Sequence, residues 1–191
     1  TTMNQSILPL AMALGLCAAS AAHADLDGPY VNAGIGAANI ERPGMGTASA
    51  WNFNAGWRWN GFGIEAGWND FGTFGRDIPV TAEGATTVHR HDIDLSGPSI
   101  GVSDRIALDE RWYLTARLGV FRWKTVYAYG PAVGSRETYR DSGSDWYGGV
   151  SIGYRVSERL GIGIGVDYIK AQGQFLEYTT NRVTLQAEYG F

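Results

Sequence analysis

The residues best suited to chemistry form one short run, His89-Arg90-His91-Asp92-Ile93-Asp94. In an extended chain side chains alternate, so the two histidines share one face and the two aspartates the other. Such a cluster could bind a metal, act as a hydrolase dyad, or contact phosphate through the arginine and the histidines. Two histidines supply fewer ligands than a zinc site needs, so we predict no metal site. A polar junction between a loop and a strand explains the run without any ligand.

A second candidate set consists of charged residues that alternate with apolar neighbours in segments rich in small residues. Its members are Arg58, Glu65, Arg117, Arg155, Asp167 and Glu188. If their face is enclosed, these charges must pair or be hydrated, because burying an unpaired charge is costly. Arg58 and Glu65 flank the Asn60-Gly61 turn and could pair, and Arg117 could reach Glu65 or Glu188. The set predicts either a structural ion network or a charge gate in a small water-filled pore.

Composition limits the classes of protein in which these residues could act. The chain has 191 residues, of which 27 are Gly, 13% are aromatic and 18% are charged, against roughly 25% charged in an ordinary soluble domain. Glycine without a triplet period excludes collagen, and the aromatic content argues against disorder. A net charge of -4 without any basic run gives no nucleic-acid footprint. The mean hydropathy of -0.15 excludes a bundle of apolar membrane helices.

The first 24 residues are predicted to be a secretory signal peptide, with Thr1 and Thr2 as extraneous residues before it. Residues 7–22 form the only long apolar stretch, and Ala22-His23-Ala24 is a small-x-small cleavage site. Cleavage after Ala24 leaves one domain, residues 25–191.

Two other interpretations of this stretch are weaker. As a transmembrane anchor it is short and lacks flanking charges. As a lipoprotein signal it would be cut before Cys17, where Leu16 stands in place of a small residue. Cys17 is also the only cysteine of the chain, so the exported domain has no disulfide.

Alternation of apolar and polar residues runs through the rest of the chain and predicts β-strands. In the clearest stretch one face carries Trp51, Phe53, Ala55, Trp57 and Trp59. A two-residue hairpin turn is expected directly after it, because Asn-Gly favours that turn. Eight strands are expected in all, at residues 29–40, 50–60, 61–71, 88–103, 111–124, 145–156, 160–170 and 182–191.

The fourth of these strands changes phase. Ile93 and Leu95 keep one parity, whereas Ile100 and Val102 keep the other. Since proline cannot donate to a strand ladder, we predict a β-bulge at Gly97-Pro98 between them.

These strands predict an all-β fold, an eight-stranded antiparallel up-and-down transmembrane β-barrel of the outer-membrane type. An even number of antiparallel strands can close without an edge. The aromatic-rich apolar face suits lipid, while the other face is too polar and small-sided for a soluble core. A soluble lipocalin-like barrel, the alternative, would place large apolar residues inside. Long extracellular loops are expected at about 41–49, 72–87, 125–144 and 171–181.

Several segments resemble the outer membrane protein A transmembrane domain. Residues 53–72 (FNAGWRWNGFGIEAGWNDFG) resemble its second hairpin, residues 113–119 its fifth strand, and residues 148–168 its sixth and seventh strands. Related small eight-stranded barrels fit almost as well. The closing Ala-Glu-Tyr-Gly-Phe resembles the signal read by the outer-membrane assembly machinery, which gives Tyr189 and Phe191 that role.

The resemblance also implies roles inside the barrel. Glu65 and Arg117 match lumen charges that form a gate in the prototype. Ser99 and Gly165 stand where the prototype has basic partners, so the same gate is not complete in this chain.

Together these features predict a monomeric integral protein of the outer membrane, with a structural role or a narrow pore for small solutes. One alternative is a surface adhesin, because loop 125–144 carries aromatic and arginine residues typical of binding sites. Another is an outer membrane protein W-like channel. The expected partners are lipid, the assembly machinery and lipopolysaccharide, whose phosphates His89, Arg90 and His91 could contact.

No enzyme activity and no cofactor are expected. Barrel lipid A deacylases look to need a His-x-Ser pair, and neither His89 nor His91 is followed two residues later by Ser. Barrel proteases are built on ten strands and longer chains. A barrel acyltransferase stays open, since its catalytic residues lie in loops without a clear motif.

Overall fold

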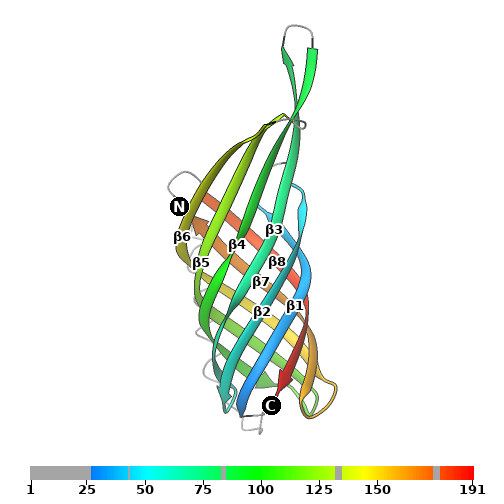
Figure 1. Cartoon of the computed structure of the whole chain (residues 1–191). Helices are drawn as coiled ribbons and strands as arrows, with labels where there is room; N and C mark the ends of the chain where they lie inside the picture. Colours follow the sequence, from blue (N-terminus) through cyan, green and yellow to red (C-terminus); the bar gives the residue numbers. More distant parts are fainter. Residues whose placement is uncertain (1–26, 43, 83–84, 132–134, 174–176) are drawn as a thin grey trace, which may run out of the picture.

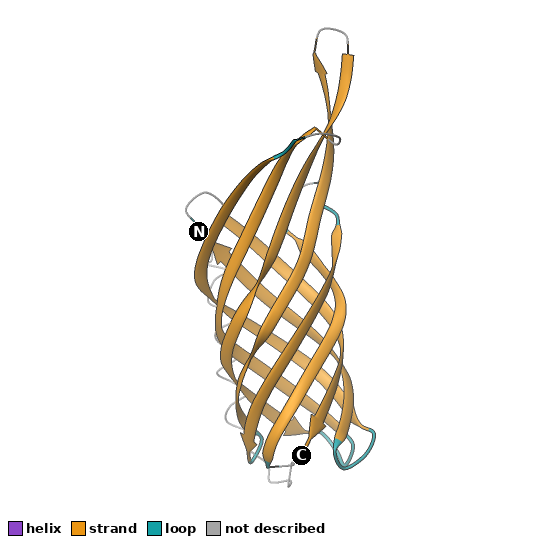
Figure 2. Cartoon of the chain, in the orientation of Figure 1, coloured by secondary structure: helices purple, strands orange, loops and turns teal. Residues whose placement is uncertain are grey.

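The protein is an all-β barrel, seen in a computed structural model that describes residues 27–42, 44–82, 85–131, 135–173 and 177–191. These residues form eight strands, which are β1 (Gly28–Ile40), β2 (Thr47–Trp59), β3 (Phe62–Ala82), β4 (Ala85–Ala107), β5 (Trp112–Pro131), β6 (Glu137–Arg155), β7 (Leu160–Gln172) and β8 (Glu177–Gly190). Each strand pairs antiparallel with the next, and β8 also pairs with β1, so the sheet closes (Figure 1, Figure 2). The predicted fold is confirmed.

The expected signal peptide, residues 1–24, lies outside the described residues. Within the described residues, no helix is long and apolar enough to cross a membrane.

The alternation predicted the two faces of the strands correctly over most of the barrel. On β2, Trp51, Phe53 and Trp57 are 44–48% exposed on the outer surface, while Asn52 and Asn54 are buried inside. Aromatic pairs mark both ends of this outer apolar band, as in outer-membrane barrels. Trp112 packs on Tyr154 and Tyr189 on Phe191 near the short turns, and Trp146 packs on Tyr168 at the opposite end.

The four central strands are much longer than predicted. Pairing between β3 and β4 continues to Ala82 and Ala85, and pairing between β5 and β6 continues to Tyr129 and Glu137. The expected loops 72–87 and 125–144 are therefore mostly strand, and that prediction was wrong. Their many Thr, Val, Ile and Tyr residues favour extended pairing. The result is a strand extension (described residues 75–82, 85–92, 125–131 and 135–143) that rises beyond the other strands on one side (Figure 1).

The predicted bulge lies on the neighbouring strand instead. The register shifts between Asp70 and Thr73 of β3, where Gly72 has a φ of 74°. On β4 the alternation continues without a break, because Ile93, Leu95 and Ser99 are all buried inside. The apparent change of phase has another cause: the barrel interior itself changes from polar to apolar along its length.

Glycines on the inner face provide room for large aromatic rings opposite them. A Cβ added to Gly153 would lie 2.2 Å from Cζ of Tyr113, and one added to Gly161 would lie 2.3 Å from its hydroxyl. The ring of Tyr147 lies in the same way against Gly119, where an added Cβ would approach Cε1 to 2.6 Å. Such close packing cannot absorb even one methyl group without displacing the ring.

We therefore expect Gly153→Ala to destabilise the barrel by about 1–3 kcal/mol, because its Cβ would displace Tyr113. Equilibrium unfolding in urea, in lipid vesicles, measures the change. Gly148→Ala on the same strand is the matched control, since its Cβ would have no neighbour nearer than 3.7 Å. Equal unfolding midpoints for the two variants would contradict this role of glycine.

Candidate functional site in the barrel interior

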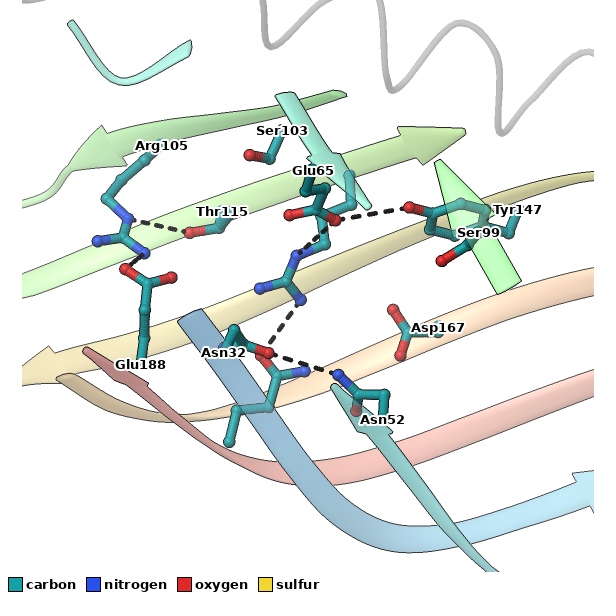
Figure 3. Close-up of polar contacts among 12 residues, drawn as sticks. Asn32, Asn52, Glu65, Ser99, Ser103, Arg105, Thr115, Tyr147, Asp167 and Glu188 are labelled. Carbon is teal, nitrogen blue, oxygen red and sulfur yellow. Dashed lines mark hydrogen bonds and ion pairs between the residues drawn. The ribbon is translucent and has the colours of Figure 1, made fainter. Parts of the chain in front are cut away.

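The interior near the short turns holds a cluster of charged side chains centred on Glu188; we call this and the similar groups below ion clusters. Arg58 donates to both carboxylate oxygens of Glu188, at 3.0 and 3.2 Å, and Arg105 donates to it at 2.6 Å. Arg105 also lies 3.4 Å from the hydroxyl of Thr115 (Figure 3). All three charged side chains are at most 8% exposed. One carboxylate thus balances two guanidinium groups supplied by β2 and β4.

A second cluster surrounds Glu65 in the middle of the barrel. Tyr30 donates to one carboxylate oxygen at 2.9 Å, and Arg117 lies 3.5 Å from the other oxygen. Tyr147 also lies 3.5 Å from that second oxygen (Figure 3). The guanidinium of Arg58 stacks 4.1 Å from the ring centre of Tyr30, so this tyrosine joins the two clusters.

A third cluster lies further along the barrel, where the polar interior ends. Arg182 donates to Asp167 at 2.7 Å and to the side chain of Asn69 at 2.8 Å. The same guanidinium lies 4.6 Å from the ring centre of Phe71. Arg182 therefore separates the ionic part of the interior from an apolar part.

The apolar part fills the end of the barrel opposite the short turns. We call its six largest fully buried members the apolar plug: Phe71, Phe74, Ile93, Leu95, Phe121 and Trp123, each at most 1% exposed. The rings of Phe71 and Phe121 lie 5.7 Å apart across the interior. Trp123 is fixed by its indole N–H, which donates to Asp145 at 2.7 Å.

Little free space remains in the polar part. A cavity of about 10 Å³ is lined by Arg105, Arg117, Gln186 and Glu188, among others. This is close to the smallest space that holds one water molecule. The interior of these described strands is therefore packed with side chains, as expected for eight strands.

The structure brings together most of the predicted interior charges. Arg58 meets Glu188 and Arg117 meets Glu65, with Asp167 in the third cluster. Arg155 lies at the end of β6, beside the turns, and is partly exposed. Its backbone N–H donates to the carbonyl of Arg111 at 2.7 Å.

Three important residues were missed in the sequence. Arg105 lies beyond the end of the predicted strand 88–103, although β4 continues to Ala107. Arg182 has the same parity as Glu188 on β8, so the alternation could have found it. Tyr30 is also inward by parity, but a large aromatic residue was expected to face lipid.

The first four residues of the histidine run, His89 to Asp92, lie on the strand extension, outside the membrane-spanning band. His89 and His91 are on one face, where their Nδ1 atoms lie 3.1 and 2.5 Å from the hydroxyls of Tyr129 and Tyr127. Burial lowers the pKa of His91, and the positive charges of nearby arginine and histidine add to this effect.

Arg90 is on the opposite face of the extension and binds Asp92 at 3.0 Å. Asp92 also accepts a hydrogen bond from the guanidinium of Arg136 at 2.6 Å. Partial burial raises the pKa of Asp92, but these two arginines outweigh it, so the pKa is lowered. Arg90 and the histidines therefore do not converge on one ligand. Among the described residues, no three His, Cys, Asp or Glu lie together as metal ligands.

A closed eight-stranded barrel with an apolar outer band, aromatic pairs at both ends and an ionic interior defines an integral protein of the outer membrane, in contact with lipid. A family model agrees. Residues 8–191 match the outer membrane protein β-barrel domain, and the chain belongs to that family.

Solved structures with the same fold have low sequence identity to this chain. Neisserial surface protein A matches with a TM-score of 0.58 and 14% identity, covering 85% of this chain and 97% of that one. Ail of Yersinia pestis, in complex with the heparin analogue sucrose octasulfate, matches at 0.57 and 13%, covering 86% and 99%. The protease OmpT of Escherichia coli matches at 0.55 and 9%, covering 91% and 100%.

These similarities establish the fold alone. No curated protein sequence matches the chain.

We expect Glu188→Gln to destabilise the barrel by about 3–5 kcal/mol, because it removes the carboxylate with which the buried guanidinium groups of Arg58 and Arg105 both pair. Urea unfolding in vesicles measures the loss. Glu158→Gln, in the exposed turn after β6, controls for removal of a carboxylate. A Glu188→Gln barrel as stable as the Glu158→Gln barrel would show that the cluster contributes nothing to stability.

Proposed function

We propose that the protein is a closed, structural barrel of the outer membrane that carries the strand extension outside the cell. The apolar plug is the observation that supports this most directly. Its rings fill the interior at the end of the ionic part, and solutes would have to displace Phe71, Phe121 and Trp123 to pass. The plug argues against a steadily open pore and against an outer membrane protein W-like channel.

The ion clusters then have a structural role. Glu65 and Arg117 lie in the polar half, and their contacts join β1, β3, β5 and β6 across the interior. A charge gate at this level would open onto the plug and would not by itself create a path. We therefore assign these charges to barrel stability.

We also propose how the protein reaches the membrane. Residues 1–24 act as a cleaved signal peptide, and residues 25–191 form the barrel domain. Tyr189 and Phe191 act as the assembly signal, which is supported by their exposed, paired rings, 5.3 Å apart. The barrel works as a monomer, without an enzyme activity or cofactor.

Surface binding through the strand extension is the second candidate function. Its support is the group of exposed or half-buried aromatic rings formed by His89, His91, Tyr127 and Tyr129, with the rings of His91 and Tyr129 4.5 Å apart. Aromatic groups of this kind are typical of binding sites. Contact with lipopolysaccharide phosphates belongs to this proposal, with His89 and His91 reaching them from one face of the extension and Arg90, which pairs with Asp92, from the other.

Conductance across a planar lipid bilayer tests the closed barrel. We expect no steady current from the refolded wild type, and channel openings from the variant Phe121→Ala/Trp123→Ala, because it removes two rings of the plug. Val120→Ala, which changes the lipid-facing neighbour, should behave like wild type. Glu65→Ala should also stay closed.

Two results would contradict the proposal. One is a wild-type current equal to that of the plug variant. The other is a current that appears in Glu65→Ala alone, which would assign closure to the ion clusters.

A further inference from the structure

A long groove crosses the lipid-facing surface of the barrel. It has a volume of about 600 Å³, within the usual range of ligand pockets. Its lining includes two small side chains, Ala33 and Ala187, which are direct partners on β1 and β8. Larger apolar residues stand beside them, among them Ile35, Ile164 and Leu185. A smooth barrel surface would have no such depression.

The groove leads from the interior of the membrane to its edge. Strand pairing forms one continuous row, from Ala33 through Ala187, Ile162 and Tyr154 to Trp112. Trp112 is the first residue of β5, at the short-turn end, which faces the periplasm in outer-membrane barrels. Because barrel strands are tilted, the row descends from the membrane interior to this aromatic belt.

A second recess begins where the groove ends. It has a volume of about 530 Å³ and is lined by Asp109, Glu110, Arg111, Trp112 and Tyr154, so it shares the aromatic pair with the groove. Unlike the groove, it carries charges of both signs.

The turn holds the charges of the recess in a defined arrangement. Asp109 accepts hydrogen bonds from the backbone N–H groups of Arg111 and Trp112, both at 2.7 Å. These bonds lower the pKa of Asp109, so it stays ionised while it closes the turn. Arg111 donates one N–H to the hydroxyl of Tyr154 at 2.8 Å. A guanidinium has five such donors, and this one lies exposed at the mouth of the groove.

We propose that the groove and the recess together bind one phospholipid of the periplasmic leaflet, whose headgroup carries a phosphate and a primary ammonium. An acyl chain lies in the groove between Ala33 and Tyr154. Arg111 binds the phosphate, and the exposed carboxylate of Glu110 binds the ammonium.

Charge complementarity favours this occupant over the others. A purely anionic headgroup has no positive group that could bind Glu110, and a trimethylated ammonium has no N–H to donate to it. A second barrel would cover the apolar groove but would have to bury Arg111 and Glu110 at its rim. A zwitterionic headgroup with a primary ammonium matches both charges and keeps them at the water interface, where aromatic side chains also lie.

Native mass spectrometry tests the site on the refolded chain, released from nanodiscs that contain equal amounts of phosphatidylethanolamine, phosphatidylcholine and phosphatidylglycerol with identical acyl chains. We expect one retained lipid per barrel, with phosphatidylethanolamine preferred. Arg111→Gln should reduce retention about tenfold, equivalent to the loss of about 1.4 kcal/mol. Glu110→Gln should remove the headgroup preference while lipid is still retained.

The groove is tested separately from the headgroup recess. Ala187→Leu and Ala33→Leu should both reduce retention without changing headgroup preference, because they fill the groove. Ala66→Leu, on the lipid-facing side of β3, and Arg159→Gln, in the next turn, are matched controls and should retain lipid as the wild type does. A heat-modifiable gel shift verifies that each variant is folded.

Four results would overturn the proposal: no retained lipid in the wild type, equal retention of the three lipids, unchanged retention in Arg111→Gln, or unchanged retention in both alanine variants. Release of the wild type as a dimer that Ala187→Leu converts to monomers would assign the groove to a contact between barrels and would equally overturn it.

Discussion

The narrow interior of an eight-stranded barrel is the constraint on which the rest of the structure depends. Such an interior is just wide enough for side chains. Several large inward rings therefore lie against a glycine, as Tyr113 does at Gly153 and Gly161. The same lack of space forces the interior charges into direct contact, because the cavity among them, about 10 Å³, leaves too little room for water to hydrate them separately. The high glycine content, the inward tyrosines and the ion clusters share this one cause.

The interior contains two zones with different chemistry. Near the short turns it is ionic, with Glu188 and Glu65 each shared among several partners. Beyond Arg182 it is apolar, and Phe71 marks the boundary. Ionic contacts join strands that are distant around the barrel. In the apolar zone, large side chains fill the interior between the strands. Both zones stabilise a closed barrel.

The strands and the direction of their side chains could be predicted from the sequence because alternation reports which face is apolar. That rule holds only while the two faces differ. At Ile93 and Leu95 the interior is also apolar, so the pattern looked like a bulge. Arg105 was missed because strand ends carry no alternation signal. Which arginine meets which carboxylate could not be predicted either, since it depends on registers that bring β2 and β4 to β8 across the interior.

The strand extension rises on one side of the barrel only, since β3 to β6 have 19–23 residues and the remaining strands 13–14. The height of the barrel wall above the membrane consequently differs from one side of the barrel to the other. A neighbour that approaches from the side of β4 and β5 meets a wall above the lipid, while one that approaches from β8 and β1 meets a low rim. The surface that a neighbouring molecule meets therefore depends on the orientation of the barrel about the membrane normal.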